Sequence, residues 1–452
     1  MIESPLLAGD LAAPIAWRAG AAISRGQFLA DAAALAERLP AGGTMLNLST
    51  DRYRFALGLG AALLRGQSSL LPPNHLADTV ARLRARFPAC YSLVEPGGDA
   101  HGLPSVAHGE AAASASIVPA VPAIDADLIA AHVLTSGSTG EPVPHAKPWG
   151  LLSINARAET SRLASMIGRG DLSGIALVAT VPPQHMYGFE SSVLLALLGG
   201  AALDAGRPFF AADLAAALAQ VPAPRMLVTT PFHLKALLDA GIVVPPLALV
   251  VCATAPLAPQ LAARAEQELK APLVEIYGCT EAGQVATRRT TAGPDWRTFE
   301  GLVLAGDGAE VTVSGGHVAV PTPLADVLEV VDAQTFRLLG RSNDLVNIAG
   351  KRSSIGHLNF HLNAIDGVVD GAFWMPPDGD AESGGIARLV AFVVAPGVSA
   401  GRIAAALRQR VDAAFVPRRI VHLEALPREA TGKITVAALA ALAERSAAAR
   451  PG

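Results

Sequence analysis

Cysteine is scarce in this sequence. Only Cys90, Cys252 and Cys279 occur among its 452 residues, and they are widely separated. This spacing fits neither a metal-binding motif nor a disulfide framework. The N-terminal residues also lack the basic start and the apolar core of a secretion signal. We therefore expect a cytoplasmic protein in a reducing compartment.

Charge and long apolar runs are scarce as well. Charged residues make up 16% of the chain and the formal net charge is −4, without a dense basic cluster. Nucleic-acid binding therefore gains no support. Hydrophobic residues make up 51%, yet the most extended apolar run, 193–205, is interrupted by Gly199, Gly200 and Asp204. Because a membrane-spanning helix needs about twenty predominantly apolar residues, we expect a globular protein without membrane insertion. Nothing indicates its oligomeric state.

Buried-strand patterns alternate with helical patterns through most of the chain. Apolar spacing predicts helices over 28–39, 51–66, 209–219 and 257–269. Continuous apolar runs predict strands over 69–71, 175–180, 226–230, 247–252 and 273–276. Such strands separated by helices indicate an α/β fold with parallel layers.

The pattern changes after about Trp296. Short alternating segments over 309–313, 317–320, 327–331 and 335–339 predict a small antiparallel β subdomain. Beyond Arg341 a strand at 389–394 and a helix at 401–415 indicate a small α+β domain. We predict two domains, 1–341 and 342–452, with the boundary at 342–344.

A run rich in hydroxyl groups and glycine follows the apolar stretch 128–134. It consists of Thr135, Ser136, Gly137, Ser138, Thr139 and Gly140. Glycines let backbone N–H groups turn toward an anion, and hydroxyl groups add donors without bulk. No Gly-Lys-Ser/Thr follows at the spacing of a Walker motif. We predict a loop that holds a polyphosphate; a flexible surface loop is the alternative.

Three more motifs follow in order. They are Tyr277-Gly278-Cys279-Thr280-Glu281, Gly340-Arg341-Ser342-Asn343-Asp344 and Pro427-Arg428-Glu429-Ala430-Thr431-Gly432-Lys433-Ile434. Together with the loop they resemble the signatures of the adenylate-forming superfamily: acyl-CoA synthetases, adenylation domains of peptide synthetases, and luciferases. The resemblance extends from about residue 55 to residue 434. It implies that a small carboxylic acid reacts with ATP to give acyl-AMP and pyrophosphate, in the presence of Mg²⁺. The acyl group then passes to the thiol of coenzyme A or of an acyl carrier protein's phosphopantetheine arm.

The resemblance also implies roles for single residues. The loop 136–140 would hold the β- and γ-phosphates, Tyr277 would lie against adenine, and Thr280 would donate to the α-phosphate. Glu281 would be the Mg²⁺ ligand, as a hard oxygen donor should. Gly278 would lie near the acyl group. The segment bordering adenine would be Ala253, Thr254, Ala255 and Pro256, where relatives usually carry glycines.

The remaining implied roles concern ribose, the acid and the C-terminal domain. Asp326 would accept hydrogen bonds from the ribose hydroxyls, although its neighbours depart from the family's Thr-Gly-Asp, and Arg341 would contact ribose and phosphate. The segment 182–188 resembles the motif that lines the acyl pocket, with His185 as its gate; a structural histidine is an equally good interpretation. Asn343 stands where relatives place a hinge aspartate or lysine, and it would be the hinge residue. Lys433 would be the mobile catalytic lysine that bridges the acyl carboxylate and the α-phosphate.

The loop departs from the family pattern in one place. Relatives continue toward Pro-Lys-Gly, whereas this chain reads Pro142-Val143-Pro144-His145-Ala146-Lys147. Our hypothesis is that Lys147 or His145 takes over the contact to pyrophosphate.

The compact chain resembles the stand-alone AMP ligases of bacterial pigment and aryl-polyene pathways, which activate small aryl acids such as hydroxybenzoates. A short- or medium-chain fatty acid remains open. Two further alternatives also remain open. One is an enzyme that adenylates without forming a thioester, which the intact Gly350-Lys351 disfavours. The other is a non-catalytic nucleotide-binding homologue, which the retention of Glu281 and Lys433 disfavours.

Overall fold

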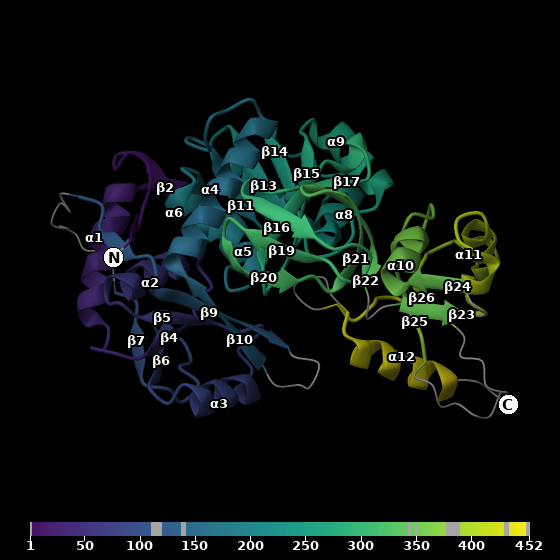
Figure 1. Ribbon diagram of the computed structural model, residues 1–452, viewed down its shortest axis with the longest axis horizontal. Helices are drawn as coiled ribbons and strands as arrows, with labels where there is room; N and C mark the ends of the chain where they lie inside the picture. Colours follow the sequence, from purple (N-terminus) through teal and green to yellow (C-terminus); the bar gives the residue numbers. More distant parts are fainter. Residues whose placement is uncertain are drawn as a thin grey trace.

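The protein consists of a large N-terminal body and a smaller C-terminal body (Figure 1). This computed structural model describes residues 2–109, 120–136, 142–341, 345–348, 351–376, 389–428 and 434–448. Parallel strands and helices build the larger body, and an α+β unit builds the smaller one. The predicted α/β fold, with its small C-terminal α+β domain, is confirmed.

The first sheet of the large body has the strand order β10-β9-β5-β4-β6-β7. Its parallel strands are β4 (Thr44–Asn47), β5 (Ser68–Leu71), β6 (Cys90–Val94), β7 (Ser105–Ala107) and β9 (Ile129–Ser136). The edge strand β10 (Pro142–Pro148) runs antiparallel to β9. The helices of this region are α1 (Arg25–Arg38), α2 (Arg52–Leu64) and α3 (Ala77–Arg86). The ends of β9 and β10 therefore flank the predicted polyphosphate loop.

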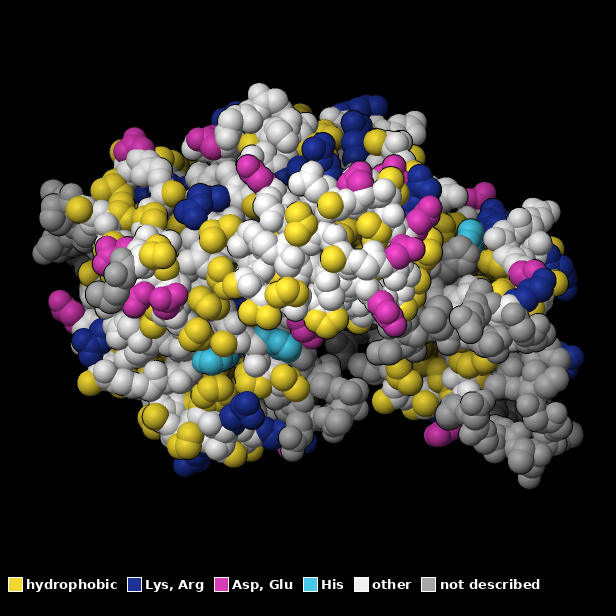
Figure 2. All heavy atoms as spheres, in the orientation of Figure 1, with side chains coloured by type: hydrophobic (Ala, Val, Ile, Leu, Met, Phe, Trp, Pro, Cys, Tyr) yellow, Lys and Arg dark blue, Asp and Glu magenta, His cyan; other side chains and the backbone are white. Residues whose placement is uncertain are grey.

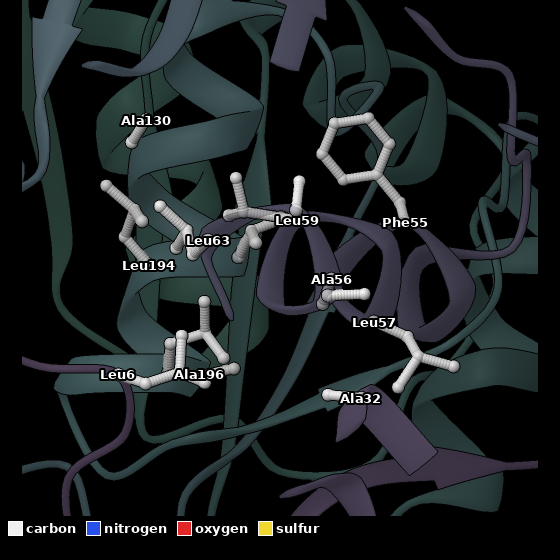
Figure 3. Close-up of a cluster of buried hydrophobic side chains, with 14 of the residues drawn as sticks. Leu6, Ala32, Phe55, Ala56, Leu57, Leu59, Leu63, Ala130, Leu194 and Ala196 are labelled. Carbon is white, nitrogen blue, oxygen red and sulfur yellow. The ribbon is translucent and has the colours of Figure 1, made fainter. Parts of the chain in front are cut away.

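Helix α2 joins the first sheet to the rest of the large body. It begins where the Asp51 side chain accepts a hydrogen bond from the backbone of Arg54, an N-cap that relieves an unpaired donor. Leu59 and Leu63 point toward Leu194 in the apolar cluster between the two parts (Figure 3). The buried Arg52 guanidinium donates to backbone oxygens at the end of the next sheet's β11 (Ala176–Ala179).

The second sheet has the order β21-β22-β17-β16-β15-β14-β13-β11-β12-β2-β3. Its parallel part comprises β2 (Pro14–Arg18), β11, β12 (Ala202–Asp204), β13 (Arg225–Thr229), β14 (Leu249–Cys252) and β15 (Leu273–Cys279). Strands β3 (Ala21–Ser24), β16 (Gly283–Arg288), β17 (Asp295–Thr298), β21 (Asp326–Asp332) and β22 (Thr335–Arg341) extend it with antiparallel pairing. Helices α4 (Trp149–Met166), α7 (Ala211–Gln220), α8 (Pro231–Asp239) and α9 (Pro259–Leu269) lie between its strands in the chain.

The segments after Trp296 are arranged differently from the single β subdomain that we predicted. Strands β18 (Leu302–Ala305), β19 (Thr312–Gly315) and β20 (Val318–Pro323) form a separate three-stranded antiparallel sheet. The hairpin of β21 and β22 instead joins β17 at the edge of the second sheet. Alternating polarity identifies a half-buried strand but not the neighbour with which it pairs.

The small body has its own sheet and core. Strands β25 (Asp370–Trp374), β26 (Val390–Val394) and β27 (Arg419–His422) form its sheet, and β23 (Leu345–Ile348) pairs with β24 (Lys351–Ser354). Phe373, Val393 and Ile403 belong to its buried cluster. Its helices are α10 (Ile355–Asn363), α11 (Ala400–Arg408) and α12 (Val436–Ala448). The helix predicted over 401–415 thus ends early, at Arg408.

No helix among the described residues is long and apolar enough to span a membrane. The predicted boundary at 342–344 falls outside the described residues, between β22 and β23, and stays a prediction.

Candidate active site

Several motif residues meet where parallel strands of the second sheet end. Cys252 at the end of β14 lies opposite Glu275 of β15, so the segment that follows β14 borders the second half of β15. Ligands of open α/β sheets bind at this carboxyl edge. Thr254 in that segment has a φ of 83°, a backbone conformation that a β-branched residue rarely adopts. The predicted adenine-bordering segment, Ala253–Pro256, therefore carries local backbone strain beside β15.

Tyr277 and Asp326 lie together at this edge. The Tyr277 hydroxyl donates to Asp326 Oδ2 at 2.7 Å. The Tyr277 ring also contacts the rings of Trp296 and Phe336, with centroid distances of 5.8 and 5.4 Å. Asp326 pairs in register with Arg341 across the β21–β22 hairpin. The structure thus brings together the residues expected at adenine and ribose, although they are 49 positions apart in the chain.

Gly278 is the second-last residue of β15, beside the tight turn that leads into β16. A methyl group added to Gly278 would lie 2.4 Å from the backbone oxygen of Gly283, so no side chain fits there without moving the turn. Thr280 and Glu281 occupy this turn, and half of the Glu281 side chain is exposed. A glycine is required here by close backbone approach, and the two residues predicted to hold phosphate and metal depend on that packing.

His145 and Lys147 of β10 lie against this turn. The Lys147 ammonium donates to the backbone oxygens of Thr280 and Glu281 at 2.5 and 3.1 Å. His145 Nε2 is 3.8 Å from Glu281 Oε1, and burial lowers the pKa of His145. Figure 2 shows histidine side chains at the surface around β10, with an acidic side chain beside them. Lys147 therefore contacts the second motif; its predicted contact with pyrophosphate stays a prediction.

Two buried carboxyl groups lie behind the turn. Burial raises the pKa of Glu190 to about 8 and that of Glu159 to about 7. Asn155 donates to Glu190 Oε1 at 2.6 Å, and the Ser191 hydroxyl donates to Glu159 Oε1 at 2.6 Å. These side chains come from α4 and from the π-helix Phe189–Leu194, a type of helix that often occurs at functional sites.

The segment predicted to line the acyl pocket precedes this π-helix. His185 is half-buried and occupies the N-cap position of the short helix α5 (Met186–Gly188). The Tyr187 hydroxyl lies 3.1 Å from the backbone oxygen of Thr229 and 3.0 Å from that of Val251, at the ends of β13 and β14. The segment therefore reaches the same sheet edge as Tyr277, and the gating role of His185 stays a prediction.

Some predicted site residues lie outside the described residues. These are Gly137, Ser138, Thr139 and Gly140 of the loop, the hinge residue Asn343 and the catalytic residue Lys433. Thr135, Ser136 and Arg341 are placed only as parts of strands β9 and β22. Their assignment continues to rest on the motifs.

The donor set at the turn suits a metal that binds together with its nucleotide. Among the described residues, no group of three or more His, Cys, Asp or Glu side chains forms a metal site. Mg²⁺ usually binds one or two carboxylates together with substrate phosphates. The half-exposed Glu281 carboxylate fits that pattern.

Sequence reasoning missed the polar residues that support the turn. Asn155, Glu159 and Glu190 are separated by up to 35 positions and belong to no motif. One signal was available in the sequence: segment 189–194 carries Glu-Ser-Ser within an otherwise apolar run. A charged residue in such a run indicates a buried polar site, because charged residues are seldom fully buried unless paired.

The fold and the ordered motifs define an adenylate-forming enzyme. The profile of the AMP-binding enzyme family matches residues 69–342, more than half of the chain, and the chain belongs to this family.

Two relatives agree with this membership, and a solved structure has the same fold. The 4-coumarate–CoA ligase of Rhodobacter capsulatus is 31% identical over 303 residues, which cover 66% of this chain and 73% of that protein. The 4-coumarate–CoA ligase of Halorhodospira halophila is 32% identical over 270 residues, covering 58% of this chain and 62% of that protein. The anthranilate CoA ligase AuaEII, solved in complex with anthranoyl-AMP, has the same fold. Its TM-score is 0.80 at 16% identity, with 98% of this chain and 96% of that chain covered.

Proposed function

We propose that this protein activates an aryl carboxylic acid with ATP and transfers the acyl group to the thiol of coenzyme A. The observation that carries the proposal is the 2.7 Å contact between Tyr277 and Asp326 beside the turn that bears Glu281. An aromatic ring and a carboxylate at a carboxyl sheet edge offer a surface for a base and an acceptor for ribose hydroxyls.

In the first step the acid's carboxylate oxygen attacks the α-phosphorus, and the bond to pyrophosphate breaks. Thr280 donates to the α-phosphate, and the loop 136–140 donates to the leaving phosphates. Lys433 brings its positive charge between the carboxylate and the phosphate, two anions that otherwise repel each other. Glu281 would hold Mg²⁺, and the bound ion would supply further neutralisation of negative charge.

The second step needs a different arrangement of the small domain. The domain after residue 342 turns about Asn343 and withdraws Lys433, so that the thiol reaches the acyl-AMP. Acyl transfer to the thiol then releases AMP. Hinges of this kind are a few residues that absorb a backbone rotation.

The acid class is inferred from the relatives. Two relatives are named for 4-coumarate, and the solved structure holds anthranoyl-AMP, so all three concern aryl acids. We propose a small aryl acid such as a hydroxybenzoate, with His185 at the entrance of its pocket. A short- or medium-chain fatty acid is the second candidate, because the segment 182–188 does not define a ring-shaped cavity.

The test is pyrophosphate release with Mg-ATP against a panel of hydroxybenzoates, cinnamates and fatty acids of increasing length, with hydroxylamine to trap acyl-AMP. Aryl hydroxamates and aryl-CoA thioesters are the expected products. Fatty acyl hydroxamates would replace the aryl assignment, and acyl transfer to a carrier protein but not to coenzyme A would replace the acceptor. No product with any acid, from folded protein that binds no ATP, would contradict the ligase assignment.

A further inference from the structure

Lys147 connects two motifs that are far apart in the chain. It lies near the end of β10, the strand that follows the predicted polyphosphate loop, whereas Thr280 is 133 positions away. Register pairing places Lys147 opposite Ala131, at the end of the β9–β10 hairpin away from the loop. The lysine therefore contacts the Thr280–Glu281 turn from the base of the hairpin and not from its tip.

The two hydrogen bonds of Lys147 are made to backbone oxygens, while its charge also interacts with the carboxyl groups of Glu190 and Glu281. An ammonium group has three N–H donors, and two of them meet the carbonyl oxygens of the adjacent residues Thr280 and Glu281, at 2.5 and 3.1 Å. Hydrogen bonds from a charged donor are about twice as strong as those between neutral groups. Two neighbouring carbonyl groups held by one cation fix the orientation of both peptide units. These two peptide units flank Glu281 and set the direction of its Cα–Cβ bond, and the first of them also borders Thr280.

Glu190 lies against the other end of the same turn, where its carboxyl group accepts a hydrogen bond from the backbone of Gln284. Gly283 closes the turn with a φ of 77°, and a methyl group added there would lie 2.9 Å from Glu190 Oε1. Glu190 is buried and is itself held by Asn155 at 2.6 Å. The segment from Thr280 to Gly283 is therefore confined between a cation on its carbonyl groups and a fixed carboxyl group at its last residue.

We propose that Lys147 is a positioning residue that sets the Thr280–Glu281 turn for nucleotide and metal through its two carbonyl groups, with Glu190 as the fixed support behind the turn. This role differs from a direct contact with pyrophosphate. The inference rests on the proposed function only in that Thr280 and Glu281 hold ATP with Mg²⁺.

The first test measures the turn itself, without any ligand. The variant Lys147→Met keeps the length of the side chain and removes the donors. Lys235→Met is the matched control, because Lys235 pairs with Asp239 on α8, away from the turn. Hydrogen exchange in the segment 279–286 is expected to become at least about fivefold faster in Lys147→Met, since local opening follows lost contacts. It should remain unchanged in the control. Unchanged exchange in Lys147→Met would overturn the proposal.

The second test is a double-mutant cycle on ATP binding, measured by calorimetry with Mg²⁺ and without an acid. Lys147→Met is expected to raise the Kd for ATP about tenfold in the parent but less than about threefold in Glu281→Gln, because the lysine acts through the turn. The same tenfold effect in both backgrounds would overturn the proposal in favour of a direct contact to the phosphates. A parent that binds ATP but forms no aryl adenylate would contradict the aryl substrate and leave this test intact.

If Lys147→Met does not fold, the same hydrogen-exchange and ATP-binding measurements are made on Lys147→Arg. A guanidinium group has several donors and can reach both carbonyl oxygens. Exchange in 279–286 and the Kd for ATP within about threefold of the parent are expected. A folded Lys147→Arg protein that loses ATP affinity more than about tenfold with unchanged exchange in 279–286 would contradict the proposal.

Discussion

Glu159 is expected to make the stability of this protein fall as the pH rises. Its side chain is fully buried on α4, and burial raises its pKa from the usual 4.5 to about 7 against the opposing hydrogen bond from Ser191. One pKa unit corresponds to about 1.4 kcal/mol. The ionised carboxylate is therefore about 3 kcal/mol less favourable in the folded protein than in the unfolded chain.

The sign of this effect follows from proton binding. Between about pH 4.5 and pH 7 the folded protein keeps the proton on Glu159 and the unfolded chain releases it, so the free energy of unfolding decreases as the pH rises. The contribution is fully present below pH 4.5 and is lost above about pH 7. Glu159→Gln imitates the protonated form at every pH, and it also removes the charge that helps to raise the pKa of Glu190.

The assay is the thermal midpoint of Glu159→Gln and of the parent at about pH 5 and about pH 8.5. Because the shift falls below about 2 °C per kcal/mol for a domain larger than about 250 residues, the variant is expected to be on the order of 4 °C more stable at the higher pH. At the lower pH it should be close to the parent. Glu37→Gln, on the exposed side of α1, is the control. An equal difference between variant and parent at both pH values would refute the argument.

Three further outcomes concern the site. Lys433→Ala is expected to slow acyl-AMP formation about 10²–10³-fold while the Kd for ATP changes less than about threefold, because its charge acts mainly in the transition state; an unchanged trapping rate with hydroxylamine would contradict this role. Asp326→Asn is expected to weaken ATP binding about tenfold in calorimetry, since an amide has one acceptor oxygen instead of two and Tyr277 already donates to one of the carboxylate's oxygens; unaltered affinity would remove it from the ribose site. Gly278→Ala places a methyl group 2.4 Å from a backbone oxygen and should abolish ATP binding. Gly42→Ala is the control and should behave as the parent, because its added methyl group meets nothing within 4 Å. Equal ATP binding by the two alanine variants would contradict the close packing of the turn.

Local signals explain which elements were predictable. The helix predicted over 51–66 is α2, because Asp51 caps it and a long, almost uninterrupted apolar stretch follows the cap. The strands predicted over 226–230, 247–252 and 273–276 are β13, β14 and β15, since buried parallel strands are continuous apolar runs. The helix predicted over 401–415 ends at Arg408 because the chain continues into a separate short helical turn at Ala413–Phe415.

Pairing between distant segments was not predictable in the same way. Strands β21 and β22 have the alternating pattern of any half-buried hairpin, and nothing in that pattern distinguishes pairing with β17 from pairing within a separate subdomain. The partners of Lys147 were hidden for a similar reason. Its carbonyl acceptors belong to the backbone, which every residue carries, so no side chain in the sequence identifies them.

The sequence by itself determined the family and the chemistry. Four motifs in order identify the AMP-binding family and with it the activation of an acid by ATP, whereas the roles of Glu281 and Lys433 stay predictions. The tertiary structure alone decided how the site is supported. In the folded protein Tyr277 donates to Asp326, and Lys147 donates to the backbone oxygens of Thr280 and Glu281. Glu159 and Glu190 are buried behind that turn. Those contacts depend on which strand and helix ends meet in space, and long-range packing rather than local sequence determines that meeting.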